Sequence, residues 1–483
     1  MSVTRLKIGY VPSHLPSYYA REYDVVNRSI AGLEGFAKEL EFDLEVIREP
    51  VVTPEDARNA SRQMDAAGVD FLLVQNSSFA MGNVITEFAK GRARLGLWGM
   101  EEPTHEGPIL LNTLVSLNLN AGILTRYLKD HSIPFKWFWG ATEHPWMGPR
   151  FRLTVQALRA IKRLEQAKIG WVGDLAPTFY NLAFDERKLE ARLGTRVHPH
   201  ELSELTERSR RVSEKLVKEQ AVVLAGVAQK IEVSSEHLER GSALYIAMRE
   251  FSEEYGYDAL AVSCWPQFQT DLGIAPCMAY SWLNEHDGLA VSCEGDVVGA
   301  ITMLMTNEIN CDQSMMLDIN DVDLEDQSVL MWHCGVSPAR FADDDGITWK
   351  NHSTLGRKDP DAQPAGVVAD LKFRPQPVTI TRICNDAEQL LVMEADIVEG
   401  RSRGFEGSRG WVKNFKMNGE PILLEDFVNT TMVEGLEHHF IVGRGHHAGA
   451  LLELATWTGM NPIEPVPYRD HLQFGSRTVR RRT

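Results

Sequence analysis

The run Lys7-Ile8-Gly9-Tyr10-Val11, near the start of the chain, returns as Lys168-Ile169-Gly170-Trp171-Val172. Each run is strand-like and ends in a turn rich in Pro, Ser, Gly or Asp. A helical region follows each turn, at 24–38 in the first case and at 184–193 in the second. Because a strand that leads into a helix is the unit from which parallel sheets are built, the repeated run predicts two α/β domains, each with its own first strand.

Further strands and helices extend both domains. The continuous apolar runs at 70–74 and 95–98 are typical of buried parallel strands in the first domain. In the second domain, the hydrophobic periodicity predicts helices at 202–232 and 236–255, which precede a strand at 259–262. Parallel strands joined by helices bring their carboxyl ends to one edge of the sheet, so we expect functional residues in the loops that follow the strands.

The composition changes after about residue 338. The segment 351–400 is rich in Val, Thr and Ile, and it alternates in a way that predicts antiparallel strands at 375–383 and 389–397. A final helix is expected at about 448–458. The predicted domains are therefore an N-terminal α/β domain at 1–167, a second α/β domain at 168–338, and a β-rich C-terminal domain at 339–483.

The charge and the apolar content exclude several classes of protein. The 483 residues carry a formal net charge of −17, and no basic face of the kind that binds nucleic acid is visible. The one basic run, at 477–482, is predicted to be a solvated tail. No apolar run reaches the roughly 18 residues of a membrane helix, and the start of the chain shows no secretory signal. The six cysteines form no C-x-x-C pair, which is typical of reduced thiols. We expect a cytoplasmic protein that binds neither nucleic acid nor membrane.

An acidic pair, Glu294 and Asp296, lies between a strand-like run at 288–292 and a helix predicted to begin at residue 297. Carboxylates at a helix N-terminus are stabilised by the helix dipole, and helix capping is a sufficient explanation for Asp296. Glu is a poor N-cap, so Glu294 is the better candidate for a functional carboxylate.

Two more clusters contain potential metal ligands. Asp318 ends an apolar run and begins an acidic loop, which could also be a solvated turn. His446 and His447 lie in a Gly-rich turn before the final helix. Glycine allows close approach of the backbone to a ligand, and imidazole is the commonest metal ligand, so this turn favours a metal site. A dinucleotide-binding loop is disfavoured there, because no room remains for the βαβ unit.

Taken in order, these clusters resemble those of the L-fucose isomerase and L-arabinose isomerase superfamily. Glu294 and Asp318 are 24 positions apart, which is typical of the two carboxylate ligands in fucose isomerases. The His446-His447 pair resembles the ligand motif of arabinose isomerases, in which the second His binds metal, and the Asn-His-Gly of fucose isomerases. His333, which lies 15 residues after Asp318, is near the place of the first His in the arabinose type and is a candidate further ligand.

The resemblance implies a chemistry. Glu294, Asp318 and His447 would bind a divalent ion, with Mn²⁺ expected and Mg²⁺ or Co²⁺ as alternatives. Glu294 and Asp318 would also be the catalytic acid and base that move a proton between two carbons of an open-chain sugar through an enediol. Four further residues are candidates for binding the sugar, of which Trp411 resembles a Trp that lines the family's pocket: Gln267, Trp411, His446 and His352.

The resemblance also implies two Rossmann-like α/β domains followed by a β-rich, barrel-like domain. The family forms trimers or hexamers whose pockets are shared between subunits, so a homo-oligomer is expected. The expected function is the interconversion of an unphosphorylated aldose, a pentose or 6-deoxyhexose, with its ketose. The chain is shorter than a typical fucose isomerase, which leaves the sugar open. An epimerase or lyase that uses the same enediolate, or a sugar-binding protein without turnover, are the alternatives.

Overall fold

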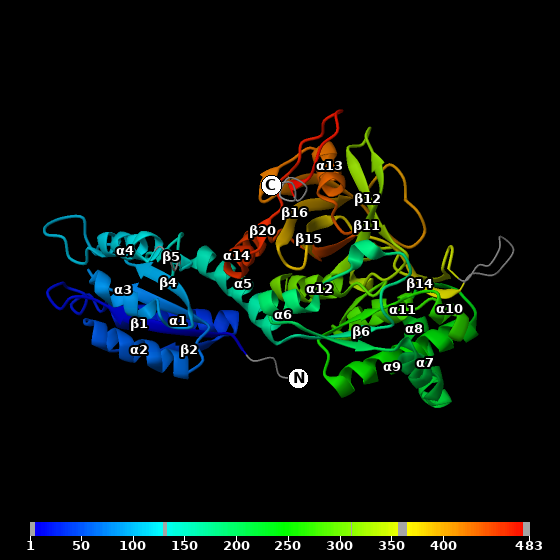
Figure 1. The fold of residues 1–483 in the computed structure, drawn as a ribbon, viewed down its shortest axis with the longest axis horizontal. Coiled ribbons are helices and arrows are strands. Elements are labelled where there is room, and N and C mark those ends of the chain that lie inside the picture. The colour runs from blue at the N-terminus through cyan, green and yellow to red at the C-terminus, as the bar shows by residue number, and fades with distance from the viewer. Residues whose placement is uncertain (1–4, 129–132, 311, 356–364, 477–483) are drawn as a thin grey trace. The chain divides into compact units, whose positions relative to one another are not determined.

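The computed structural model describes residues 5–128, 133–310, 312–355 and 365–476 (Figure 1). The predicted basic tail at 477–482 lies outside these residues. Contacts within the chain define two compact units, Met1–Arg159 and Ala160–Thr483. The predicted fold class is confirmed, because the chain combines parallel sheets covered by helices with a large, mainly antiparallel β-structure.

The first unit is built on a parallel sheet with the strand order β2-β1-β3-β4-β5. The predicted runs at 7–11, 70–74 and 95–98 each fall on one of its strands. The strands are β1 (Lys7–Ser13), β2 (Asp43–Val46), β3 (Phe71–Asn76), β4 (Arg94–Gly99) and β5 (Phe135–Trp139). Its helices are α1 (Val25–Leu40), α2 (Pro54–Ala66), α3 (Gly82–Phe88), α4 (Thr113–Gly122), η1 (Ile123–Tyr127) and the start of α5 (Gly148–Gln166).

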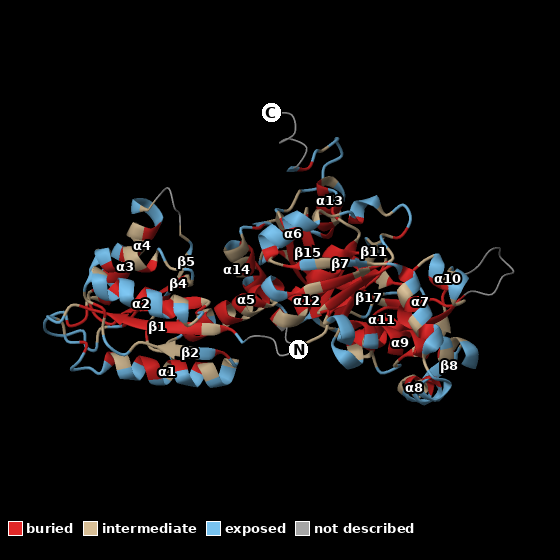
Figure 2. Ribbon diagram, turned by 60° about the horizontal axis from the view of Figure 1, so that its bottom comes forward, coloured by how far each residue is buried: buried red, intermediate tan, exposed pale blue. Residues whose placement is uncertain are grey.

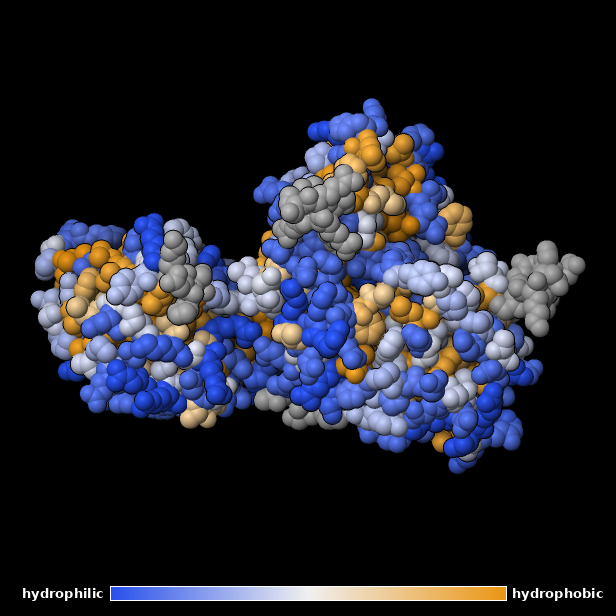
Figure 3. Space-filling model, in the orientation of Figure 1, coloured by the Kyte–Doolittle hydropathy of each residue, from blue (hydrophilic) through white to orange (hydrophobic). Residues whose placement is uncertain are grey.

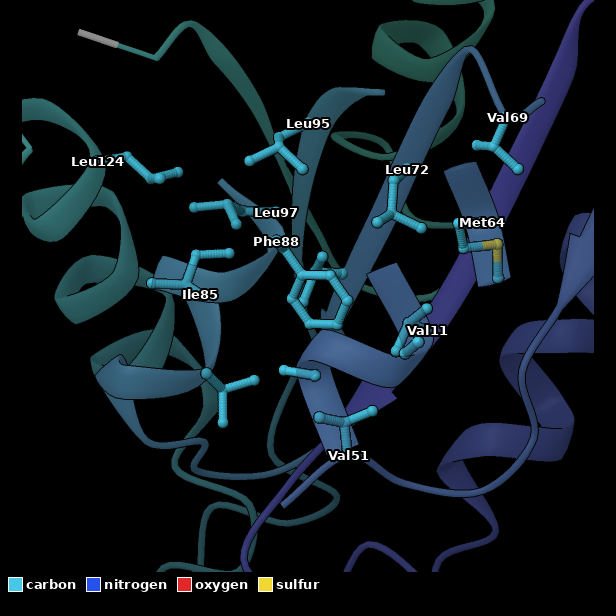
Figure 4. Close-up of a cluster of buried hydrophobic side chains, with 14 of the residues drawn as sticks. Val11, Val51, Met64, Val69, Leu72, Ile85, Phe88, Leu95, Leu97 and Leu124 are labelled. Atoms are coloured by element: carbon cyan, nitrogen blue, oxygen red, sulfur yellow. The ribbon is translucent and has the colours of Figure 1, made fainter. Parts of the chain in front are cut away.

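Apolar side chains from the strands and helices of this unit form a continuous core (Figure 4). Leu72 and Leu97 project from the sheet toward Met64 on α2 and Phe88 on α3, and all four are almost completely buried. Figure 2 shows the same pattern, with buried strands between helices that expose one face. A helix begins at Pro54 because Thr53 forms a capping box with the third helical residue.

The second unit begins with another parallel sheet, in the order β10-β9-β6-β7. Its strands are β6 (Lys168–Val172), β7 (Arg196–His200), β9 (Ala259–Val262) and β10 (Ala290–Ser292). The repeated run at 168–172 is therefore the first strand of this sheet, as predicted. The associated helices are η3 (Tyr180–Leu182), α6 (Glu186–Leu193), α7 (Leu202–Arg211), α8 (Glu214–Val227), α9 (Ser235–Tyr255), α10 (Gln267–Asp271), α11 (Cys277–Trp282), η4 (Leu283–Asp287) and α12 (Val297–Asn310).

A closed antiparallel barrel follows. Its strands pair in the order β16-β15-β19-β11-β12-β17, and β17 pairs back to β16, which closes the ring. They are β11 (Met315–Asp323), β12 (Ser328–His333), β15 (Gln376–Cys384), β16 (Gln389–Val398), β17 (Ser408–Met417) and β19 (His439–Arg444). Closure leaves no free sheet edge among these strands. The antiparallel pair predicted at 375–383 and 389–397 is confirmed as β15 and β16.

Shorter elements surround the barrel. They are β8 (Lys230–Glu232), η5 (Ala339–Phe341), β13 (Thr348–Asn351), β14 (Gly366–Lys372), β18 (Glu420–Pro421), α13 (Leu424–Glu434), α14 (Ala448–Thr458) and β20 (Asn461–Pro462). The barrel already includes β11 and β12, which precede residue 338. The division into three domains at residues 167 and 338 stays a prediction.

One helix joins the two halves of the second unit. α12 packs against β9 and β10 of the parallel sheet and against β15 and β19 of the barrel. Its N-terminus follows the carboxyl end of β10, where α/β sheets carry their functional groups. Residues just before α12 therefore face the barrel strands that carry Arg382 and His439.

Candidate active site

The turn between β10 and α12 adopts a conformation that few residues tolerate. Glu294 has a φ of 61° and Gly295 a φ of 74°, both in the left-handed region. A Cβ atom at Gly295 would lie 2.2 Å from the carbonyl oxygen of Asp174, so only glycine fits there. The amide of Gly295 donates to the carbonyl of Val262 at 3.1 Å, which ties the turn to the end of β9. The sequence Glu294-Gly295 thus fixes the direction of the Glu294 side chain.

The register of the barrel brings Asp318 and His439 together. Asp318 on β11 lies directly opposite His439 on β19, and directly paired residues project from the same face of a sheet. His333, at the end of β12, approaches from the other neighbour of β11, and its ring centroid is 5.4 Å from that of His439. One nitrogen or oxygen atom of each of the three side chains lies within 4.8 Å of the others.

Three polar atoms in this cluster have no hydrogen-bond partner within the described part of the chain. They are Asp318 Oδ1, His333 Nε2 and His439 Nε2, and all three are buried. Buried polar atoms are almost always hydrogen-bonded, so unsatisfied atoms that share one location need a specific explanation. A carboxylate oxygen and two imidazole nitrogens are common ligands of divalent metal ions, and a cation would satisfy all three at once.

Glu294 lies beside the same cluster. Its Oε2 atom is 3.2 Å from Nε2 of His438 and 3.4 Å from Nε2 of His439. Burial raises the pKa of the Glu294 carboxyl, but the hydrogen bond from His438 and the nearby imidazole of His439 outweigh burial and hold that pKa at about 2. Glu294 is therefore ionised at neutral pH. The ring of His438 packs against Phe179, with centroids 5.2 Å apart.

A buried ion pair orients His439. Asp296 Oδ2 accepts a hydrogen bond from Nδ1 of His439 at 2.9 Å, and the guanidinium of Arg382 bonds to both Asp296 oxygens at 2.5 and 3.0 Å. All three side chains are completely buried. Asp296 holds the Nδ1 proton and leaves Nε2 as the atom that faces Asp318 and Glu294, which is how second-layer carboxylates orient histidines that bind metal.

Charge and burial set the protonation of these groups. Burial raises the pKa of Asp296, but the Arg382 charge outweighs burial and lowers it. Burial alone would lower the pKa of His439, whereas Asp296 and Glu294 raise it to about 10. Asp296 also accepts from the amide of Gly299 at 2.8 Å, so it caps α12 in addition to orienting His439. The capping role considered from the sequence is therefore one of two.

The structure does not bring His447 to this cluster. His447 follows the opposite end of β19, which runs from His439 to Arg444 at about 3.3 Å per residue, and it lies three residues beyond Arg444. Its backbone amide donates to Thr379 Oγ1 at 2.9 Å, and its Nε2 atom contacts the carbonyl of Arg444 at 3.0 Å. His447 therefore does not lie beside Glu294 and Asp318 in this structure, and its role as a ligand stays a prediction. Each end of β19 carries a His-His pair, and sequence order alone does not select the pair that faces Asp318.

The residues predicted to bind sugar are placed in different surroundings. His446 is exposed, with Nε2 3.3 Å from Asp396 at the same end of β19 as His447. Trp411 is part of the barrel wall on β17 and donates from Nε1 to the carbonyl of Ser402 at 2.9 Å. Neither lies with the cluster around Asp318. Gln267 opens α10, close to Trp265, whose ring is 6.2 Å from Phe179.

His352 and His333 are closer to the cluster. His352 is buried, and one of its ring nitrogens lies within 4.8 Å of the sulfurs of Cys277 and Cys334. Cys334 in turn contacts His333, the further ligand that the sequence suggested. The residues that sequence reasoning missed are His438, His439 and Arg382. A usable signal for Arg382 was a charged residue inside the alternating apolar run Val378-Thr379-Ile380-Thr381-Arg382-Ile383.

Comparison with known proteins gives the reaction class. No family model matches the chain. A sulfoquinovose isomerase of Priestia aryabhattai is 29% identical over 395 residues, which is 80% of this chain and 83% of that protein. Sulfoquinovose isomerases of Alkalicoccus urumqiensis and Clostridium sp. (strain MSTE9) are each 24% identical over 81% of the chain, and 85% and 82% of those proteins are covered.

The chain matches solved structures only weakly. A solute-binding protein of an ABC transporter from Agrobacterium vitis, with bound tagatopyranose, is 11% identical over 64% of this chain and 90% of that chain, with a TM-score of 0.18. No helix in the described ranges has the length and apolar character of a membrane span.

The sulfoquinovose isomerase relatives establish an enzyme of the aldose–ketose isomerase class.

Proposed function

We propose that this aldose–ketose isomerase depends on a divalent metal ion held by Glu294, Asp318, His333 and His439. The observation that carries the proposal is the set of buried, unpartnered atoms on Asp318, His333 and His439, next to the ionised Glu294. The ion, when bound, would polarise the sugar carbonyl and stabilise negative charge as an enediol develops.

The ligand set favours Mn²⁺ or Co²⁺ over Mg²⁺. Carboxylate oxygens suit Mg²⁺ and Mn²⁺ alike, but imidazole nitrogens are bound better by transition metals. His333 and His439 converge with Asp318, and Glu294 Oε2 lies 3.4 Å from His439, so imidazole nitrogens would make up a large share of the ligands. Mn²⁺ combines tolerance of oxygen ligands with affinity for imidazole, and it remains the proposed ion.

The two carboxylates are the proposed proton carriers. Glu294 is ionised and can remove the proton from carbon 2 of the open-chain aldose and return it to carbon 1. Asp318, across the cluster, can move the hydroxyl proton from oxygen 2 to oxygen 1, which completes the conversion to the ketose. His438 holds Glu294 Oε2 by its hydrogen bond, and the Phe179 ring packs against His438.

The proposed substrate is an unphosphorylated aldose. Sulfoquinovose is the first to test because the relatives are named for it. The 6-deoxyhexoses and pentoses expected from the sequence are the next. Phe179 and Trp265 offer apolar ring faces at the edge of the site, and such faces suit the C–H side of a sugar.

We also propose a cytoplasmic homo-oligomer, a trimer or hexamer. The first unit exposes several apolar side chains on and beside α4, among them Leu114, Val115 and Leu119, and Figure 3 shows apolar patches on the surface of this unit. Exposed apolar patches often mark interfaces. Sedimentation of the purified protein would test the assembly, and a monomer at micromolar concentration would contradict it.

One set of assays tests the function. The protein is stripped with a chelator, reloaded with Mn²⁺, and offered sulfoquinovose, 6-deoxyhexoses and pentoses. We expect ketose formation that requires the ion, and Glu294→Gln should lose about 10²–10⁴-fold in kcat. Product analysis in deuterated water separates an isomerase from an epimerase or lyase. Binding without turnover of any sugar, or full activity without metal, would refute the proposal.

A further inference from the structure

A group of buried thiols lies next to the proposed metal ligand His333, and the proposed isomerisation does not use them. Cys334 follows the ligand His333 directly, and its sulfur is 3.7 Å from the sulfur of Cys277. A third sulfur, that of Cys293, lies within 4.8 Å of Cys334 and of the His333 ring. Cys293 immediately precedes Glu294, so the thiols contact the site from two of its elements.

Cys334 makes two different contacts to one atom of His333. Its backbone amide donates to Nδ1 of His333 at 2.9 Å, and its sulfur lies 3.2 Å from the same nitrogen. The other ring nitrogen, Nε2, is buried and has no partner within the described residues. Nδ1 can thus meet either a donor, the amide, or an acceptor, the sulfur, and both belong to Cys334.

These two contacts match the two proton positions of a neutral imidazole. When Nδ1 accepts from the amide, the ring proton is on Nε2 and points toward Asp318. When Nε2 binds an ion through its lone pair, the proton must sit on Nδ1, which then needs an acceptor. Sulfur is a weak acceptor, but it is the acceptor in contact with Nδ1.

We propose that Cys334 is a positioning residue whose sulfur accepts the Nδ1 proton of His333 when His333 binds the metal ion through Nε2. This inference rests on the proposed function, because it assumes the metal centre. No proton is gained or lost by the ring, since one proton leaves Nε2 and one arrives at Nδ1. The sulfur does here what a second-layer carboxylate does for His439.

The surroundings of Cys334 support an acceptor role. A thiol proton on Cys334 that points to the sulfur of Cys277 leaves sulfur lone pairs facing His333. The backbone is also fixed, because Gly335 has a φ of 127° and a Cβ atom there would lie 2.6 Å from Val368. The carbonyl of Gly335 accepts from the amide of Ala369 at 3.1 Å. The sulfur is therefore held beside His333.

The test measures metal binding directly. Mn²⁺ is titrated into the chelator-treated full chain, and free Mn²⁺ is followed by electron paramagnetic resonance. We expect Cys334→Ala to weaken Mn²⁺ binding by about 10–100-fold, and Cys334→Ser, whose hydroxyl can accept, to recover most of the loss. Cys264→Ala is the matched control, because Cys264 is a buried thiol beside Cys293 and should bind Mn²⁺ like the wild type.

A spectroscopic readout separates this role from packing. In the Co²⁺-loaded protein, each ligated histidine with an Nδ1 proton gives a paramagnetically shifted proton resonance that disappears in deuterated water. We expect the His333 resonance in the wild type and in Cys334→Ser, and its loss or broadening in Cys334→Ala.

The outcomes are distinguishable. Wild-type protein that binds no Mn²⁺ would overturn the metal centre and this inference together. Wild-type binding with an equally tight Cys334→Ala variant, or a Cys334→Ser variant as weak as Cys334→Ala, would overturn the inference about Cys334 alone.

Discussion

The two His-His pairs of this chain lie at opposite ends of one barrel strand. His438 and His439 begin β19 and face Glu294, Asp296 and Asp318. His446 and His447 follow its other end, where their contacts are the carbonyls of Ala395 and Arg444 and the carboxylate of Asp396. The dipeptides are identical, so everything that differs between them comes from the fold.

The difference is visible in their charge states. Nearby carboxylates raise the pKa of His439 to about 10 against the effect of burial. Burial lowers the pKa of His447, and no carboxylate reverses that shift. A metal ion needs negative charge and convergent lone pairs around it, and only the first pair has both. Chemical type makes a residue a candidate ligand, but partners across the strands decide whether it is one.

The sharpest way to break this comparison is to remove one histidine from each pair. His439→Gln should abolish tight Mn²⁺ binding and lower kcat/KM by about 10³-fold or more, since several kcal/mol of ion-derived stabilisation are lost. His447→Gln should keep both within about threefold, as expected for a residue outside the site. Metal content by mass spectrometry and steady-state rates check both. If both variants lost Mn²⁺ binding and activity to the same extent, His447 would have to be a ligand as well.

The ion pair behind His439 should matter next. Asp296→Asn removes the charge that fixes the Nδ1 proton and should weaken Mn²⁺ binding by about 10–100-fold. It should also destabilise the fold by about 3 kcal/mol, because Arg382 is left as an uncompensated buried charge. Calorimetry and Mn²⁺ titration measure the two effects separately.

Asp258→Asn is the matched control for that variant. Asp258 pairs with Arg163 at 2.6 Å at the opposite end of β9 from the site, and both side chains are mostly buried. Its loss should lower stability and leave Mn²⁺ affinity unchanged. If both variants weakened Mn²⁺ binding alike, general destabilisation would explain the result.

Proton release is a smaller, pH-dependent effect. In the ion-free chain the pKa of His439, about 10, exceeds the ordinary 6.5. Protonation of His439 therefore stabilises the ion-free fold fully below pH 6.5, and this contribution is lost as the pH rises through 10. Mn²⁺ must displace this proton, so its apparent affinity should rise by about tenfold per pH unit.

Isothermal titration in buffers of different ionisation enthalpy, between pH 7 and 8.5, counts the protons released. An affinity that is independent of pH in this range would show that His439 is not a ligand. His447→Gln serves as the reference, and its pH dependence should equal that of the wild type.

The smallest effect is expected for the stability role of the second pair. The His447 side chain bonds to the carbonyl of Arg444, just before α14. His447→Ala should cost about 1 kcal/mol, the usual value of one such hydrogen bond, and leave turnover intact. Thermal denaturation measures the loss. A loss of activity without a loss of stability would contradict the assignment.

Local patterns predicted much of the fold. The apolar runs that became β1, β3, β4 and β6 are readable because buried parallel strands need continuous apolar sequence. Local apolar runs do not predict that the barrel closes, because the pairing of β16 with β17 depends on twist and register across all six strands. For the same reason, the early membership of β11 and β12 in the barrel was missed.

The site residues likewise differ in whether local sequence or strand register reveals them. Glu294 and Asp318 were found because each follows an apolar run, which is a local feature, although Asp318 lies within β11 and not in a loop after it. His439 was missed because its role depends on the register that places it opposite Asp318, and spacing along the chain contains no register. His333 was suggested by its distance from Asp318 and does lie in the cluster, although its role as a ligand stays a prediction.

The left-handed backbone at Glu294 sets stability and activity against each other. A residue with a side chain costs roughly 1 kcal/mol or more in that conformation, whereas glycine adopts it freely. Glu294→Gly should therefore relax the turn while it removes the carboxylate. If variants were selected for thermal stability alone, substitutions that remove Glu294 would be favoured, although the proposed turnover depends on this residue. Engineering of the thermal stability of this enzyme therefore needs an activity assay in every round of selection.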